Sequence, residues 1–436
     1  MGGILKSITA DASSFRLESL TPKERIFFVL QAAAIVVAPV WLLIDTGSKF
    51  AFIFFLASLL VLNRIKLPVW SRLLLAALDL TVVMPIVGNT SGIFANVITM
   101  IGIYAILSMG LNIVVGFTGL LNLGYAAFYA VGAYTYAIFA SSQANNLIPG
   151  GGFPLSGNWF WLFLVIALVV SGIVGFLLGL PVLRLKGDYL AVVTLGFAEI
   201  IRLLFNNLNK PVNITNGPMG ITPIQPPMLF GVSLDRPVYY YGVVLILFLL
   251  TVVVVRNLQN SRIGRAWVAI REDELVARTM GIPVVRMKLL SFTIGAGLAG
   301  LMGVVFAAKQ KFIDPTSFTF AESIVILCMV ILGGTGSIKG VIIGALSVVV
   351  LQLQILKDVS AWLTDLNASG VLHLPSWLDP AKYERLIFGL ILVLMCIFRP
   401  HGLLPEKRML QIKKRLGLKT KAAEDESAQA TLKGGQ

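Results

Sequence analysis

The sequence predicts an all-α polytopic membrane protein, and three observations support that fold class. The mean hydropathy is +0.87 and only 13% of the 436 residues are charged, whereas about a quarter of residues are charged in a soluble globular domain. Apolar runs recur from residue 26 almost to residue 398. Because a bilayer core about 30 Å thick needs roughly 20 apolar residues per helix, these runs predict one bundle of about 10 to 12 transmembrane helices, some broken or re-entrant.

The apolar runs divide the chain into three parts. Candidate spans cover residues 26–44, 50–62, 70–88, 93–115, 118–140, 159–182, 188–207, 238–255, 288–308, 320–333, 338–356 and 385–398. Residues 1–92 are expected to form a polar arm with about three extra spans, and residues 93–405 the main bundle. Residues 406–436 form a tail that is first basic and then disordered, because "KTKAAEDESAQATLKGGQ" lacks apolar side chains to bury.

Positive charge assigns the loops to the two sides of the membrane, since Lys and Arg in short loops stay in the cytoplasm. The connector "SSQANNLIPGGGFPLSGN" has no cationic residue, whereas residues 256–288 contain seven and the tail from Arg399 to Lys421 contains eight. We therefore expect residues 141–157 outside, residues 256–288 inside and both termini in the cytoplasm. This distribution also explains the net charge of +14 without a nucleic acid partner.

The stretch "GLNIVVGFTGLLNLGYAAF" combines an apolar composition with residues that interrupt a helix. Gly116 and Gly119 allow the helix to break, and a break at membrane depth is tolerated only inside protein or beside a water-filled cavity. Asn112, Thr118 and Asn122 then meet either the freed backbone or a solute. Two interpretations stay open: the polar side chains bridge helices, or they line a passage.

Small residues recur at helical spacing elsewhere in the spans. Gly295, Ala299 and Gly303 lie four residues apart, as do Gly340 and Gly344. Helices in lipid associate through close packing of small residues, because hiding leucine gains little there. This pattern predicts tight contacts between helices.

Glu199 and Arg202 lie three residues apart in an apolar run and so share one helix face. A charge at mid-bilayer costs on the order of 3 kcal/mol, so such residues usually face the bundle interior and are functional candidates. We expect an internal ion pair. The alternative is that Arg202 lies near the interface and extends its guanidinium into the headgroups.

Motifs of soluble catalysis are missing from the sequence. "GGTGSIKG" does not fit the nucleotide-binding patterns GxxxxGK[ST] or GxGxxG after a strand, and we interpret it as a turn between spans. The chain has no HExxH, GxSxG or paired-cysteine site, and Cys328 and Cys396 both lie in apolar runs. We therefore expect no enzyme activity, no catalytic residue, no metal and no cofactor in this chain.

The cytoplasmic segment "IGRAWVAIREDELVARTMGIP" predicts a short charged helix that ends at Gly281. Its candidate contact residues are Arg265, Trp267, Arg271, Glu272, Asp273, Glu274 and Gly281. We interpret it as a docking surface for a cytoplasmic partner, on which Arg271 and Glu274 act in coupling and not in folding. A helix lying flat in the headgroups would explain the arginines and the tryptophan but not the acidic triplet.

Five motifs in order resemble the LivH/LivM permeases of branched-chain amino acid ABC importers. They are "GLNIVVGFTGLLNLGYAAFYAVGAYTYA", "KGDYLAVVTLGFAEIIR", "TNGPMGI", "SRIGRAWVAIREDELVARTMGIPVVRMKLLSF" and "VILGGTGSIKGVIIGA". The resemblance runs from about residue 95 to residue 405, and the extra N-terminal spans resemble the longer, LivM-type subunit. It implies a permease bundle in the bacterial inner membrane that imports Leu, Ile or Val. The residues from Arg265 to Gly281 then correspond to the coupling element that meets the ATPases.

The resemblance also implies partners. These are a shorter LivH-type sister permease, two cytoplasmic ATPase subunits that hydrolyse the ATP, a periplasmic amino acid-binding protein and membrane lipids. The translocation path is expected to involve Asn112, Thr118, Asn122, Glu199 and Arg202. The alternative function is an ion-coupled secondary transporter of small polar solutes, which needs inverted repeats and midplane carboxylates and leaves the charged loop unexplained.

Overall fold

The computed structural model describes residues 79–90, 92–182, 188–229 and 231–368, with a few positions between 37 and 55 and between 383 and 404. The predicted tail and residues 70–78 of the span at 70–88 lie outside the described residues, as do half of the span at 385–398 and all but a few positions of the spans at 26–44 and 50–62. The chain divides into two compact units. Unit 1 comprises residues 1–102 and 234–247, and unit 2 comprises residues 103–233 and 248–436.

The described part of unit 1 is almost entirely helical. Its elements are η2 (Asp79–Val83), α5 (Met84–Thr90), the first half of α6 (Gly92–Asn112) and the first half of α10 (Pro237–Asn260). A Cβ on Gly102 would lie 2.4 Å from Cγ1 of Val244, so α6 and α10 approach each other closely within this unit. The Tyr241 hydroxyl donates to the Leu80 carbonyl at 2.6 Å and ties α10 to η2.

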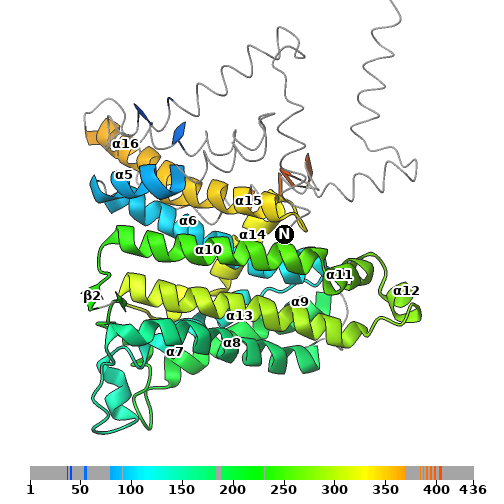
Figure 1. Cartoon of the computed structure of the whole chain (residues 1–436), viewed down its shortest axis with the longest axis horizontal. Helices are drawn as coiled ribbons and strands as arrows, with labels where there is room; N and C mark the ends of the chain where they lie inside the picture. Colours follow the sequence, from blue (N-terminus) through cyan, green and yellow to red (C-terminus); the bar gives the residue numbers. More distant parts are fainter. Residues whose placement is uncertain are drawn as a thin grey trace, which may run out of the picture. The chain divides into compact units, whose positions relative to one another are not determined.

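Unit 2 contains most of the described helices (Figure 1). After the second half of α6 come η3 (Ile113–Phe117), α7 (Tyr125–Ala137), α8 (Phe160–Val182), α9 (Asp188–Asn207), the second half of α10, α11 (Arg262–Glu272), α12 (Glu274–Thr279), α13 (Val284–Gln310), α14 (Phe320–Gly333), α15 (Ile338–Val350), η8 (Leu351–Ile355) and α16 (Leu356–Ala368). Helix α13 packs against both α7 and α8, which also contact each other, and α14 packs on α15. The connections between these helices contain short elements. These are η4 (Ser142–Asn146), η5 (Gly157–Trp159), η6 (Gly217–Met219), η7 (Pro315–Phe318) and the two-stranded hairpin of β1 (Met228–Leu229) and β2 (Val232–Ser233).

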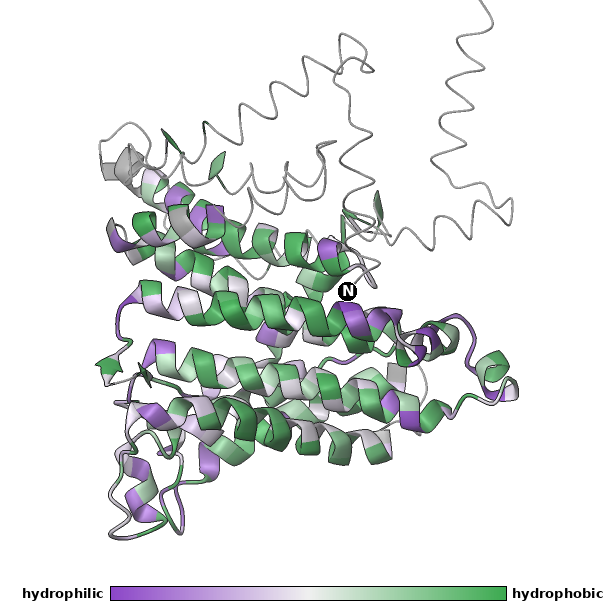
Figure 2. Cartoon of the chain, viewed as in Figure 1, coloured by the Kyte–Doolittle hydropathy of each residue, from purple (hydrophilic) through white to green (hydrophobic). Residues whose placement is uncertain are grey.

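Six described helical segments are long and apolar enough to cross a membrane, and they confirm six of the predicted spans. They cover residues 92–117, 157–181, 189–207, 237–260, 284–310 and 338–363. The shorter apolar α14 coincides with the predicted span at 320–333. Figure 2 shows these helices as largely hydrophobic, with many hydrophilic residues in the connections. The fold is therefore that of an all-α polytopic membrane protein.

Small residues bring the helices of unit 2 into backbone contact, as their spacing predicts. A Cβ on Gly132 of α7 would lie 2.0 Å from the carbonyl oxygen of Gly300 in α13, and a Cβ on Gly303 would lie 2.3 Å from that of Tyr129. A Cβ on Gly344 of α15 would likewise lie 2.0 Å from the carbonyl oxygen of Met329. Any larger residue at these positions must push two helices apart, so the glycines fix the packing distance.

Candidate functional site

The long helix that begins at Gly92 breaks where the sequence predicts it. Helix α6 widens at Asn112 into the π-helical turn η3, whose C-cap is Thr118, and Gly119 follows with a φ of +73°. A new helix starts only at Tyr125. π-Helical turns inside helices occur frequently at functional sites, because they re-aim the backbone locally.

The three polar residues of this break hold the freed backbone. The Asn112 side-chain oxygen accepts from the Gly336 amide at 2.8 Å, the Thr118 hydroxyl donates to the Val114 carbonyl at 2.6 Å, and the Asn122 oxygen accepts from the Gly124 amide at 2.9 Å. All three side chains are buried. The amide nitrogens of Asn112 and Asn122 have no hydrogen-bond partner among the described residues. The Asn112 contact supports the bridging interpretation for that residue, whereas the Asn122 contact is local to the break; a role of these side chains in a passage stays a prediction.

Glu199 and Arg202 form the predicted ion pair, but not in the predicted place. The Arg202 Nε donates to both Glu199 oxygens at 3.0 Å. The side chains are 43% and 25% exposed, so the expectation of a pair enclosed by this chain's own bundle is wrong. The reason is the orientation of α9, whose buried side includes Leu190, Thr194 and Ala198 and not the ion pair.

Helix α11 is attached to the rest of unit 2 by Trp267, one of the candidate contact residues. The Ser261 hydroxyl oxygen accepts from the Gly264 amide and caps the helix start. The Trp267 ring is fully buried, stacks on Phe117 of η3 with centroids 6.4 Å apart, and donates its indole N–H to the Met287 carbonyl at 2.7 Å. Trp267 therefore anchors α11 beneath the helix break and does not face a partner.

Arg271 also points inward. One guanidinium nitrogen donates to the Gly116 carbonyl, and the other donates to the Thr335 hydroxyl at 3.4 Å. A Cβ on Gly119 would lie 3.1 Å from the Arg271 Cγ, so the arginine stem packs along the backbone of the break. Thr335 belongs to the "GGTGSIKG" segment, which is the turn between α14 and α15, as predicted.

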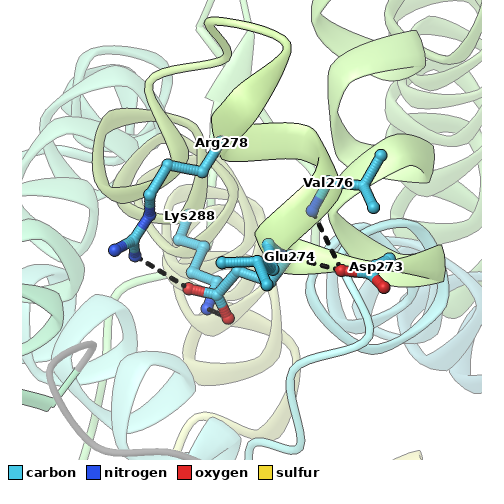
Figure 3. Close-up of polar contacts among 6 residues, drawn as sticks. Asp273, Glu274, Val276, Arg278 and Lys288 are labelled. Atoms are coloured by element: carbon cyan, nitrogen blue, oxygen red, sulfur yellow. Dashed lines mark hydrogen bonds and ion pairs between the residues drawn. The ribbon is translucent and has the colours of Figure 1, made fainter.

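The acidic triplet does not lie in one continuous helix. Helix α11 ends at Glu272, and Asp273 adopts an extended conformation with a φ of −155°. Its carboxylate accepts from the amides of Leu275 and Val276 at 2.8 and 3.0 Å, which caps the start of α12 (Figure 3). The prediction of a single helix is therefore wrong. The helix is interrupted because Asp273 leaves the helical conformation and caps the free amides at the start of α12. Gly281 follows with a φ of +80°, which confirms the predicted stop.

Glu274 lies between two basic side chains (Figure 3). Its carboxylate pairs with the Lys288 ammonium at 2.7 Å and with Arg278 at 3.4 Å. The Lys288 side chain is only 7% exposed, so α12 is tied to the buried start of α13. Arg271 and Glu274 therefore both bind groups of their own chain, and their action in coupling rather than in folding stays a prediction.

The outward side of the hairpin carries residues that the sequence analysis did not select. Leu275 is 71% exposed, Val276 56% and Met280 77%; we call these three residues the α12 face. Arg265, Glu272 and Asp273 are also exposed. The missed signal is that these apolar residues follow a cap and precede a glycine stop, so the helix is too short to bury them all.

The α11 and α12 hairpin and the loops around η4 lie at opposite ends of unit 2 (Figure 1). In a membrane-spanning unit these two ends face opposite sides. The seven cationic residues of one segment and the absence of any from the other follow the same division.

Known proteins place this architecture in a family. Residues 93–396 match the family described as "Branched-chain amino acid transport system / permease component". The chain is 40% identical over 378 residues to the high-affinity branched-chain amino acid transport system permease protein LivM of Salmonella typhimurium and to that of Escherichia coli, covering 81% of this chain and 78% of each relative. It is 25% identical over 266 residues to the LivH permease protein of Escherichia coli, covering 58% of this chain and 81% of that relative. No solved structure matches the chain. The chain thus belongs to the permease family of branched-chain amino acid transport systems.

Proposed function

We propose that this permease moves leucine, isoleucine and valine into the bacterial cytoplasm as one of two membrane subunits of an ATP-driven importer. Two cytoplasmic ATPase subunits hydrolyse the ATP, and a periplasmic binding protein delivers the amino acid. The chain itself performs no catalysis. The family and the 40% identity to LivM over 81% of this chain support the substrate class.

The observation that carries the ATP-driven mechanism is the α12 face. Its three apolar side chains are exposed at a charged end of unit 2. Exposed apolar residues that cluster and are rimmed by charge are typical of a protein interface. A helix in the headgroups would not place Glu272 and Asp273 beside those residues, because anionic lipids repel carboxylates. An ATPase subunit is the occupant that this position and this chemistry favour.

A second permease subunit explains why α9 has an ion pair on its exposed side. Its ion pair is partly exposed among the outward apolar residues Ile200 and Leu203. Exposed to lipid, this pair would lack the protein or aqueous surroundings that charged residues in spans usually have. Escherichia coli has two permease proteins of this transport system that resemble the chain, LivM and LivH. We infer that a LivH-type sister subunit covers Glu199 and Arg202, and that the path runs beside them.

Reconstitution tests the proposal directly. The complete importer in proteoliposomes with enclosed ATP and external binding protein is expected to accumulate labelled leucine, with no accumulation when ADP replaces ATP. The chain alone under a sodium or proton gradient serves as the comparison. Leucine uptake in that second preparation, without ATPase subunits, would establish the ion-coupled alternative and refute the ATP-driven importer.

The proposed orientation predicts which side a reagent reaches. Ser142 and Thr279 are both exposed, one in η4 and one in α12, so each can be changed to cysteine in a chain whose Cys328 and Cys396 are serine. In intact spheroplasts, a thiol reagent that cannot cross the membrane should label Ser142→Cys and leave Thr279→Cys unlabelled until the membrane is opened. The reverse pattern would invert the topology.

A further inference from the structure

We propose that Arg271 is the positioning residue that transmits movement of the α11 and α12 hairpin to the broken helix, and is not a contact to the ATPase. The inference rests on the proposed function, because it concerns how ATPase docking reaches the membrane part. Its basis is that this one side chain joins three segments that lie far apart in the sequence. They are the break around Gly116, the turn around Thr335 and the end of α11.

The contact at Gly116 suits a guanidinium. Gly116 lies in the last turn of η3, where carbonyl groups lack partners within the helix and carry the negative end of the helix dipole. Arginine presents several donors in a rigid fork, so it can bind the Gly116 carbonyl and the Thr335 hydroxyl together. A lysine ammonium in the same place can reach one acceptor well, but not both in that geometry.

The parts joined by Arg271 have little freedom to move separately. The Asn112 oxygen holds the Gly336 amide, and a Cβ on Gly116 would lie 2.5 Å from that amide nitrogen. The break and the turn between α14 and α15 are therefore in backbone contact. Phe117 stacks on the buried Trp267 of α11, so the hairpin touches the same break a second time.

Arg271 lies where a movement of α12 is transmitted to the membrane-spanning helices. It lies in the last turn of α11, two residues before Asp273, the extended residue at which α11 ends and α12 begins. A partner that moves the α12 face pulls on this junction first. The guanidinium transmits that displacement to the Gly116 carbonyl and to the turn at Thr335. The positions of these two groups then determine whether the broken helix is closed or open.

The test compares three variants of the complete importer. Arg271→Met keeps the stem along Gly119 and removes both donors, Arg271→Lys keeps the charge, and Arg262→Met is the control on an exposed arginine at the other end of α11. Each complex is reconstituted, and three quantities are measured: the amount of bound ATPase subunit, the rate of ATP hydrolysis and the leucine imported per ATP.

For Arg271→Met we expect bound ATPase and hydrolysis within about twofold of wild type and import per ATP lower by about tenfold or more, the order expected when a hydrogen bond to a charged group is lost. Arg271→Lys should lie between, and Arg262→Met should match wild type. Unchanged import per ATP in Arg271→Met would overturn the inference, as would loss of ATPase binding in proportion to import, because that pattern belongs to a docking residue.

Two further outcomes are decisive. If Arg271→Met does not fold, Thr335→Val removes only one acceptor, and an unchanged import per ATP in that variant contradicts the inference. If the wild-type complex shows no ATP-dependent import, the proposed function fails before any variant is compared. A working wild type with an unaltered Arg271→Met rejects this inference alone.

Discussion

Replacing Leu275, Val276 and Met280 together by serine is expected to abolish uptake and to release the ATPase subunits, while leaving the membrane yield unchanged. The yield should hold because all three side chains are exposed in the chain itself. Binding should fail because each apolar side chain that a partner covers contributes about 1.5 to 3 kcal/mol, so the three together correspond to at least about a 1,000-fold loss of affinity. The measurements are leucine uptake in cells and co-purification of the ATPase subunits in detergent.

A matched control lies at the other end of unit 2. Leu147, Ile148 and Met219 are also exposed apolar residues, and their replacement by serine should leave co-purification of the ATPase subunits at the wild-type level. Wild-type amounts of ATPase on the Leu275, Val276 and Met280 variant would show that the ATPases dock elsewhere. Equal losses in both variants would point to a general defect of assembly.

Local sequence patterns predict much of the described fold. Apolar runs give the spans, because the bilayer imposes one length on every crossing helix. The break at Gly119 and the stop at Gly281 follow from backbone conformations that glycine adopts more readily than other residues. Such features depend on neighbours in the chain, so a single sequence contains them.

The direction of each charged side chain could not be predicted in the same way. Arg271 binds residues more than sixty positions away in the sequence, and nothing near it in the chain shows that it turns inward. Its helix carries exposed Arg262 and Arg265, which look alike in composition. The charged loop therefore predicts an interface, but only tertiary packing separates the side chains that face a partner from those that hold the loop in place.

The ion pair on α9 illustrates the other limit. The three-residue spacing predicts that Glu199 and Arg202 meet, and they do. Which way the pair faces depends on the rotation of α9, which its small and polar residues Thr194 and Ala198 set by packing inward. In a subunit of a larger assembly, a face that is exposed in one chain can be buried in the complex. The sequence therefore indicates that a charged pair in a span is covered by protein, but it does not indicate which chain covers it.

Changing Glu274 to glutamine is expected to destabilise the permease, in contrast to what a surface ion pair would predict. Lys288 is almost fully buried and its ammonium pairs with Glu274 at 2.7 Å. Removing one partner of a buried pair costs about 3 to 5 kcal/mol, because the other charge stays buried without compensation. Glu274 is itself one third exposed, so water reaches the pair and we expect about 2 to 3 kcal/mol, at or below the lower end of that range.

Thermal unfolding of purified variants in one detergent measures this effect. Glu274→Gln should lower the midpoint by a few degrees, whereas Glu274→Gln combined with Lys288→Met should regain most of the loss, since replacing both charges of a buried pair is often nearly neutral. Arg278→Met is the control, because Arg278 is largely exposed and meets Glu274 at 3.4 Å, and such pairs are worth about 0 to 1 kcal/mol. A double variant as unstable as Glu274→Gln would mean that the buried ammonium is not the cause, and that Glu274 stabilises α12 through its own position in the first turn.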